Sequence, residues 1–184
     1  MGLAIATKSF ECTIDGGLAH IVLSQLAVHG NVAGGSVSLM AAADLVVIGK
    51  SARISSAFTK IGFTPDSGST TTVTRRIGPA RARRFFLLAE TMDTDAALSI
   101  GLVDYVVDDD AVLTEAEKIA RGLAPGPTET YGGIKRLFLQ TPNRSLESQL
   151  EDEAQTLAAI SRTADAKEGV RAFREKRKAE FAGK

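Results

Sequence analysis

A glycine pair and a nearby aspartate are the residues of this sequence whose types and spacing best suit chemistry. Gly34 and Gly35 follow a short apolar run at 26–28 and precede residues 36–43, whose small residues suit a helix packed closely on a sheet. The first N–H groups of a helix have no intrahelical partner and carry the positive end of the helix dipole. Glycines let another molecule's oxygen come close to them. The pair therefore predicts a site for an anionic oxygen, or one that becomes anionic during a reaction, although tight packing of a helix on a sheet would also require glycines.

Asp66 lies in a Pro-Asp-Ser-Gly turn at residues 65–68. Two interpretations stay open at this point: the side chain caps the helix that follows or forms an Asx-turn, or it is a general acid/base. An ordinary aspartate titrates near ~3.9, so proton transfer near neutral pH requires a raised pKa. Burial beside Ile61 and Phe63 would raise it.

Composition and charge exclude several other classes of function. The formal net charge is zero, which argues against electrostatic binding of nucleic acid or of a membrane surface. Neither the GxxxxGK[ST] phosphate loop nor the GxGxxG dinucleotide pattern occurs. The single cysteine excludes an intramolecular disulfide and gives no metal-site spacing, so we expect no metal and a reducing cytoplasm. The longest apolar run, 32–48, contains Asp44 and is expected to be a buried strand-helix-strand rather than a membrane span.

The elements that position this site alternate between strands and helices. Strands are predicted at 10–14, 19–23, 26–28, 45–48 and 102–107, and helices at 36–43, 69–77, 79–89 and from residue 93 to Gly101. Helices then follow at 114–123, 128–139, 145–160 and 166–181. We therefore expect an α/β protein of one domain, 1–184, with a core at 1–107 and a helical subdomain at 108–184.

One face of the predicted helix at 145–160 is apolar. The side chains on that face are those of Leu146, Leu150, Ala154, Leu157 and Ile160. Such a stripe is typical of a protein core or a contact between subunits.

Several segments together resemble the crotonase superfamily, the enoyl-CoA hydratases and isomerases. Residues 29–36 (HGNVAGGS) and 39–44 (LMAAAD) are similar to its glycine-rich core segment, and residues 57–68 (AFTKIGFTPDSG) to the form found in ring-epoxide isomerases of phenylacetyl-CoA catabolism and related enoyl-CoA isomerases. Later segments agree in family order, at 75–78, 96–104 and 167–181. From Leu26 onward the resemblance covers essentially the whole chain.

The resemblance implies a crotonase-like ββα spiral core with a C-terminal helical oligomerisation subdomain. It implies an acyl-CoA thioester substrate whose carbonyl oxygen lies between two backbone N–H groups, with Gly35 as the second donor and Gly34 as its support. Coenzyme A then enters as part of the substrate, with no separate cofactor. A homotrimer or hexamer is implied too, in which Phe173 and Lys176 reach the coenzyme A bound by a neighbouring subunit.

Two positions depart from the hydratase pattern. Ser38 and Phe58 match the positions where hydratases have two glutamates that handle water, whereas Asp66 matches the aspartate of several isomerases. A single carboxylate suffices for a 1,3-proton shift. We therefore expect an acyl-CoA isomerase acting on an enoyl-CoA or a ring-epoxide acyl-CoA, with Ser38, Phe58 and Phe63 as candidate substrate contacts; the alternative is an enoyl-CoA hydratase.

The chain is roughly 70 residues shorter than is usual for the superfamily. The shortfall falls after Gln25, where the loop with the first oxyanion donor is expected. Either the sequence omits an internal stretch or the protein has lost it. Loss of one oxyanion donor costs on the order of 10² to 10³ in rate, so a non-catalytic remnant that only oligomerises is a further alternative.

Overall fold

The computed structural model describes residues 4–9 and 23–184, and for residues 4–9 the backbone alone. The described residues belong to two compact units, one with residues 4–8 and 24–119 and the other with residues 9, 23 and 120–184. The predicted hairpin at 10–14 and 19–23 lies almost wholly outside the described residues. From the sequence we expect one domain whose helical subdomain starts at residue 108. That organisation stays a prediction.

The first unit contains two small sheets. The larger has the strand order β1-β2-β4-β7 and the smaller has the order β3-β5-β6. The strands are β1 (Ala4–Ser9), β2 (Ser24–His29), β3 (Val32–Ala33), β4 (Leu45–Gly49), β5 (Ile54–Ser55), β6 (Thr91–Met92) and β7 (Tyr105–Val107). β4 pairs in parallel with both β2 and β7, with Val28 opposite Ile48 and Ile48 opposite Val106. β3 is parallel to β5, which pairs antiparallel with β6.

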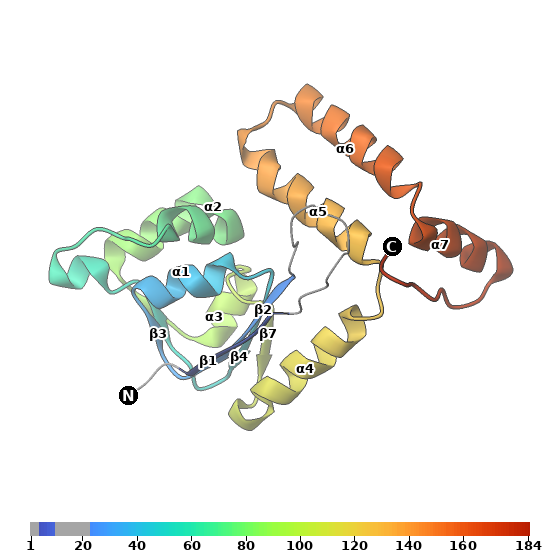
Figure 1. Ribbon diagram of the computed structural model, residues 1–184. Coiled ribbons are helices and arrows are strands. Elements are labelled where there is room, and N and C mark those ends of the chain that lie inside the picture. The colour runs from blue at the N-terminus through green and yellow to red at the C-terminus, as the bar shows by residue number, and fades with distance from the viewer. Residues whose placement is uncertain (1–3, 10–22) are drawn as a thin grey trace. The chain divides into compact units, whose positions relative to one another are not determined.

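Helices cover both faces of the larger sheet. The helices of this unit are α1 (Gly35–Ala42), α2 (Ser69–Leu88), α3 (Thr94–Ser99) and α4 (Val112–Leu123), with short 3-10 turns η1 (Phe58–Ile61) and η2 (Asp109–Ala111). Leu26, Val28 and Ile48 belong to the main core with residues of α1, α2 and α3, whereas Ala27 and Val47 pack with residues of α4. Figure 1 shows α1, α2 and α3 together on one side of the strands. The period-two alternation of the strands therefore separates the two layers of helices.

The strand and helix predictions in this unit are confirmed at β2, β4, α1 and α3, within one or two residues at most ends. α2 is the two predicted helices joined at a break, because Gly78 has φ 79° and ψ 162° and Pro79 follows it. The strand predicted at 102–107 is wrong in its first half: β7 begins at Tyr105, and Leu102 and Val103 are core residues outside any strand.

The second unit is helical. It contains α5 (Thr128–Gln140), the 3-10 turn η3 (Thr141–Asn143), α6 (Leu146–Ile160) and α7 (Ala164–Glu175). α5 packs on α6, and Gly133 allows their close approach, because a Cβ atom there would lie 3.1 Å from Cγ2 of Thr156. The apolar stripe on α6 is mostly exposed: Leu146, Leu150 and Leu157 are 71, 56 and 70% exposed. The stripe is therefore not core within the described chain.

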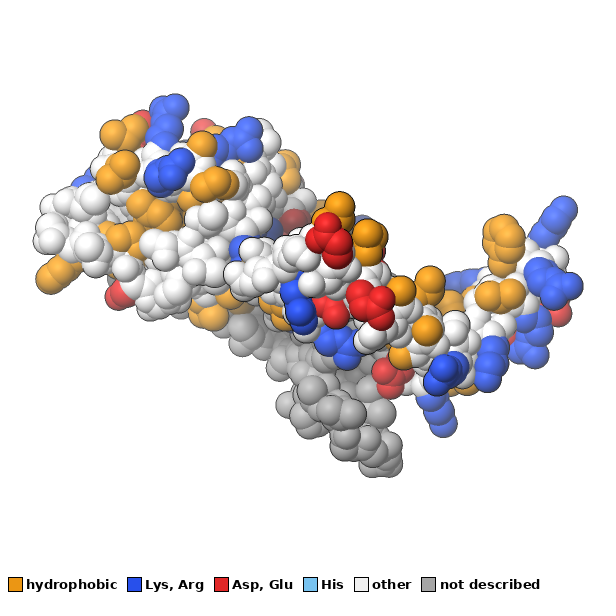
Figure 2. All heavy atoms as spheres, turned by 90° about the horizontal axis from the view of Figure 1, so that it is seen from above, with side chains coloured by type: hydrophobic (Ala, Val, Ile, Leu, Met, Phe, Trp, Pro, Cys, Tyr) orange, Lys and Arg blue, Asp and Glu red, His pale blue; other side chains and the backbone are white. Residues whose placement is uncertain are grey.

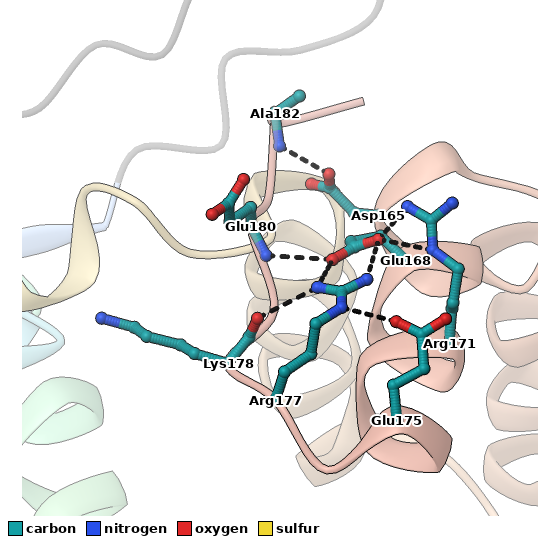
Figure 3. A network of polar contacts seen from close by, with 8 residues as sticks. All are labelled: Asp165, Glu168, Arg171, Glu175, Arg177, Lys178, Glu180 and Ala182. Atoms are coloured by element: carbon teal, nitrogen blue, oxygen red, sulfur yellow. Dashed lines mark hydrogen bonds and ion pairs between the residues drawn. The ribbon is translucent and has the colours of Figure 1, made fainter.

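The helix predicted at 166–181 is wrong at its C-terminal end. α7 ends at Glu175, Lys176 has a left-handed φ of 55°, and residues 177–184 turn back along the helix. The buried carboxylate of Asp165 accepts a hydrogen bond from the N–H group of Ala182 at 2.7 Å (Figure 3). It also accepts one from the N–H group of Gly183 at 2.9 Å. These contacts satisfy backbone groups of the tail without a helix.

Candidate active site

The glycine pair lies where the sequence placed it, at the start of α1. Gly34 precedes the helix with φ 59° and ψ −132°, a conformation that disfavours any residue with a Cβ atom. Its N–H donates to the carbonyl oxygen of Ser55 at 3.3 Å, which fixes it to β5. No acceptor for the N–H of Gly35 is found among residues 4–9 and 23–184. The helix start therefore presents an unpartnered donor at the end where the dipole favours negative charge.

Asp66 lies close to Gly35. A Cβ atom built on Gly35 would be 3.5 Å from Oδ1 of Asp66 and 3.4 Å from Oγ of Ser67. Glycine at residue 35 thus leaves a methyl-sized gap between the helix start and the carboxylate. The two residues predicted to act together, 31 positions apart in sequence, are brought together by the packing of α1 on α2 (Figure 1).

The turn that carries Asp66 is held through its backbone. The N–H and Oγ of Ser69 donate to the carbonyl oxygen of Asp66, at 2.9 and 2.7 Å. Gly68 precedes α2 with φ 74°, and no side chain caps the helix. The interpretation of the Asp66 side chain as a helix cap is therefore wrong. Ser67 has φ 52°, a left-handed conformation that costs a residue with a Cβ atom about 1–2 kcal/mol.

The burial expected around Asp66 is not found. Asp66 is exposed, and Ile61 and Phe63 are 68 and 67% exposed. The short turn η1 has one buried residue, Phe58, so the neighbouring apolar side chains face outward instead of covering the carboxylate.

Ser38 follows the glycine pair on α1, and Phe58 packs near Gly34. Ser38 is 3% exposed and donates a hydrogen bond from Oγ to the carbonyl oxygen of Ser67 at 2.5 Å. Phe58 is 8% exposed and belongs to the main core, with the tip of its ring 4.0 Å from a Cβ atom built on Gly34. Both predicted contacts are thus next to the site but buried, whereas Phe63 is exposed.

Phe173 and Lys176 belong to the second unit. Phe173 is 86% exposed on α7, and Lys176 is exposed at the residue where α7 ends. Lysine and arginine side chains gather over α7 (Figure 2). These two residues therefore remain available for contact with a ligand or another chain.

An arginine without a predicted role, Arg76, anchors the other end of α1. Arg76 on α2 donates to the carbonyl oxygens of Ala41 and Ala43, at 3.2 and 2.7 Å, and pairs with Asp104 at 3.1 Å. Asp104 also accepts from the N–H of Val46 at 2.7 Å. The partners of Arg76 lie 28 to 35 residues away along the chain, so no local pattern could have identified this cluster.

Metal and membrane features are absent from the described residues. No group of three or more His, Cys, Asp or Glu side chains in that part of the chain is placed to hold a metal ion. None of the helices described above has both the length and the apolar character needed to cross a membrane.

Comparison with known proteins identifies the family. The enoyl-CoA hydratase/isomerase family model matches residues 18–184. The chain is 37% identical over 158 residues to the 1,2-epoxyphenylacetyl-CoA isomerase of Escherichia coli K12, covering 86% of this chain and 60% of that protein. It is also 37% identical to a probable enoyl-CoA hydratase of Rhodobacter capsulatus, covering 86% of this chain and 62% of that protein.

Solved structures agree with the sequence matches. A putative enoyl-CoA hydratase/isomerase from Mycobacterium abscessus superposes with a TM-score of 0.82 at 34% identity, covering 86% of this chain and 61% of that one. The chain thus spans about 60% of the length of the relatives it matches. It has the crotonase fold and belongs to the enoyl-CoA hydratase/isomerase family.

Proposed function

We propose that the chain is an acyl-CoA isomerase, in which the N–H of Gly35 binds the thioester oxygen and Asp66 moves a proton. The observation that carries this proposal is a distance: Oδ1 of Asp66 lies 3.5 Å from the position that a Cβ atom on Gly35 would occupy. An oxyanion donor and one carboxylate then face the same small gap. Of the residues predicted for the site, Asp66 alone carries a carboxylate.

The proposed reaction uses this pair in two proton transfers. The Asp66 carboxylate removes a proton from the α-carbon of the thioester, and the negative charge that develops on the thioester oxygen is stabilised by the N–H of Gly35. The resulting carboxylic acid then returns the proton at the γ-carbon, which shifts the double bond by one position. A ring-epoxide acyl-CoA would present its thioester oxygen to the same donor.

Replacing Asp66 tests the proposal directly. Asp66→Asn keeps the shape of the side chain but removes the base, so exchange of the α-hydrogen in D₂O should fall by about 10² to 10⁴ while acyl-CoA binding is kept. Asp110→Asn, at an exposed residue of η2, is the matched control and should exchange as the unmodified protein does. Unchanged exchange in Asp66→Asn would refute the assignment.

A hydratase activity is the second candidate, because one relative carries the name probable enoyl-CoA hydratase. The products distinguish the two: a hydratase forms a 3-hydroxyacyl-CoA from an enoyl-CoA, whereas an isomerase forms only the shifted alkene. The third candidate, a non-catalytic remnant, is motivated by the share of the relatives' length that the chain spans. Equilibrium dialysis with an acyl-CoA separates it, because a remnant would bind none.

We also propose that the protein assembles in the cytoplasm as a homotrimer or hexamer through the exposed stripe on α6. Leu146 and Leu157 are among the most exposed large apolar side chains of the second unit, and an exposed apolar patch is typical of an interface. Phe173 and Lys176 would then contact coenzyme A bound by a neighbouring subunit. Sedimentation of Leu157→Ser should show smaller particles than the unmodified protein.

A further inference from the structure

A buried hydrogen bond lies beside the site. Ser38 is on the second turn of α1, the helix whose first residue is Gly35, and it is 3% exposed. Its Oγ donates to the carbonyl oxygen of Ser67, the residue that follows Asp66, at 2.5 Å. One side chain thus joins the helix that carries the oxyanion donor to the turn that carries the carboxylate.

The single proton of Ser38 is committed to that bond. A serine hydroxyl has one proton to donate and can otherwise only accept. The second neighbour of Ser38, Oγ1 of Thr72, lies 3.3 Å away and is also 3.4 Å from the carbonyl oxygen of Gly68, to which it donates. Ser38 therefore has no proton to give to a water molecule unless it releases Ser67.

The residue that Ser38 holds has a strained backbone. Ser67 has φ 52° although it carries a Cβ atom, and Gly68 follows with φ 74°. Such conformations persist only where surrounding contacts hold them, and they cluster at functional sites. Ser69, the first residue of α2, binds the carbonyl oxygen of Asp66. Ser38 reaches the same turn from α1.

We propose that Ser38 is a positioning residue, whose hydrogen bond to the carbonyl oxygen of Ser67 holds the Asp66 turn against α1 at the distance that the reaction needs. This inference rests on the proposed function for its effect on rate. Ser38 matches the position where hydratases have a glutamate that handles water. In this chain the residue at that position would have a structural role instead. Relaxation of the turn would move the carboxylate away from the gap at Gly35 without removing any group that touches the thioester.

Ser38→Ala tests the inference, with Ser56→Ala as the matched control. Ser56 is likewise buried and donates to a carbonyl oxygen, that of Phe85 at 3.2 Å, but it does not hold the Asp66 turn. Two readouts are measured on both variants of the whole chain: hydrogen exchange at the amides of residues 66–72, and α-hydrogen exchange of an acyl-CoA with its binding constant.

The expected result is faster amide exchange at 66–72 in Ser38→Ala than in Ser56→Ala. The rate of α-hydrogen exchange should fall about 10- to 100-fold, because small misplacements of a reacting group have effects of this size, and acyl-CoA affinity should change less than about twofold, because the change leaves ligand contacts in place. Equal amide exchange at 66–72 in the two variants would overturn the inference. So would formation of a 3-hydroxyacyl-CoA that Ser38→Ala abolishes.

The failure of this inference differs from the failure of the proposed function. If the unmodified protein exchanges no α-hydrogen, the isomerase proposal fails, and the amide exchange at 66–72 still decides whether Ser38 holds the turn. If the protein is active and Ser38→Ala is as fast as Ser56→Ala, the isomerase proposal stands and the positioning role is refuted.

Discussion

Between residues 24 and 119 the apolar side chains of the strands and helices are largely enclosed by their own unit, whereas between 120 and 184 most of the large ones face solvent. Val46, Val47 and Ile48 of β4 are fully buried, but Phe138 of α5 and Leu157 of α6 are 74 and 70% exposed. The first unit is therefore stabilised by its own core. The second combines the contact of α5 with α6, charged contacts around α7, and apolar surface that a further partner would cover.

This difference agrees with where we propose the chemistry. Gly35 and Asp66 belong to the enclosed unit, and a rigid scaffold holds reacting groups at fixed distances better than a mobile one does. The exposed stripe belongs to the other unit, where a contact between subunits would add burial without disturbing the site. Stability and assembly should therefore respond to different substitutions.

A large-to-small change in each unit should give the clearest contrast. Ile48→Ala removes a fully buried side chain from the centre of the larger sheet and should lower the free energy of unfolding by about 2–5 kcal/mol. Leu157→Ala removes an exposed side chain and should change the stability of the isolated chain by less than about 0.5 kcal/mol. Urea unfolding, with hydrogen exchange to separate the two units, measures both. Equal losses would show that the second unit has a core of its own around α6.

A second contrast is between buried and exposed charge on the same helix. The Arg76 side chain is 11% exposed, and Arg76→Met would break its bonds to Asp104 and to the carbonyl oxygens at the end of α1. Charged hydrogen bonds of this kind contribute about 1.5–3 kcal/mol, so the first unit should be destabilised by that amount. Arg84→Met is the control: Arg84 is 70% exposed and pairs with Glu90, and such surface pairs contribute at most about 1 kcal/mol. If the Arg84 variant lost as much as the Arg76 variant, the buried cluster would not be special.

The elements that could be predicted from the sequence are those with local signals at their ends. The elements α1, α3, β4 and α6 were predicted because turn residues and caps bound them: Asp93 and Ser145 both accept hydrogen bonds from their helices. The strands β1, β3, β5 and β6 were not predicted. Three of the four have two residues, too few to show a period of two, and they exist through pairing with distant partners.

At the proposed site, the glycine pair and Asp66 could be singled out because their local sequence patterns are informative. The resemblance then implied that they act on the same substrate. The Ser38 contact could not be found, because its acceptor is a backbone carbonyl 29 residues away and any residue type has one. The end of α7 was missed for a related reason: the charged spacing of residues 166–181 suits a helix, but Asp165 and Glu168 bind the amides of the tail instead.

The smallest of these effects should come from the charged cluster of the second unit, and it should depend on pH. Glu168 binds Arg177 at 2.6 Å, contacts Arg171 and accepts from the N–H of Glu180 (Figure 3), and the two arginines lower the pKa of its carboxyl from 4.5 to about 2. Because the folded pKa is below the unfolded one, the ionised group stabilises the folded tail above about pH 4.5, and this contribution is lost as the pH falls toward 2.

Glu168→Gln isolates that contribution. Hydrogen-exchange protection of residues 177–184, corrected for the intrinsic pH dependence of exchange, should be lower in the variant than in the unmodified protein at pH 7, and the two should converge on acidification from about pH 4.5 toward 2. Glu175→Gln is the control, because Glu175 is half exposed and binds Arg177 alone, so the tail should keep most of its protection. The first unit should show no such difference between the variants at any pH. A difference that persists unchanged at pH 2 would mean that the shape of the Glu168 side chain, and not its charge, holds the tail on α7.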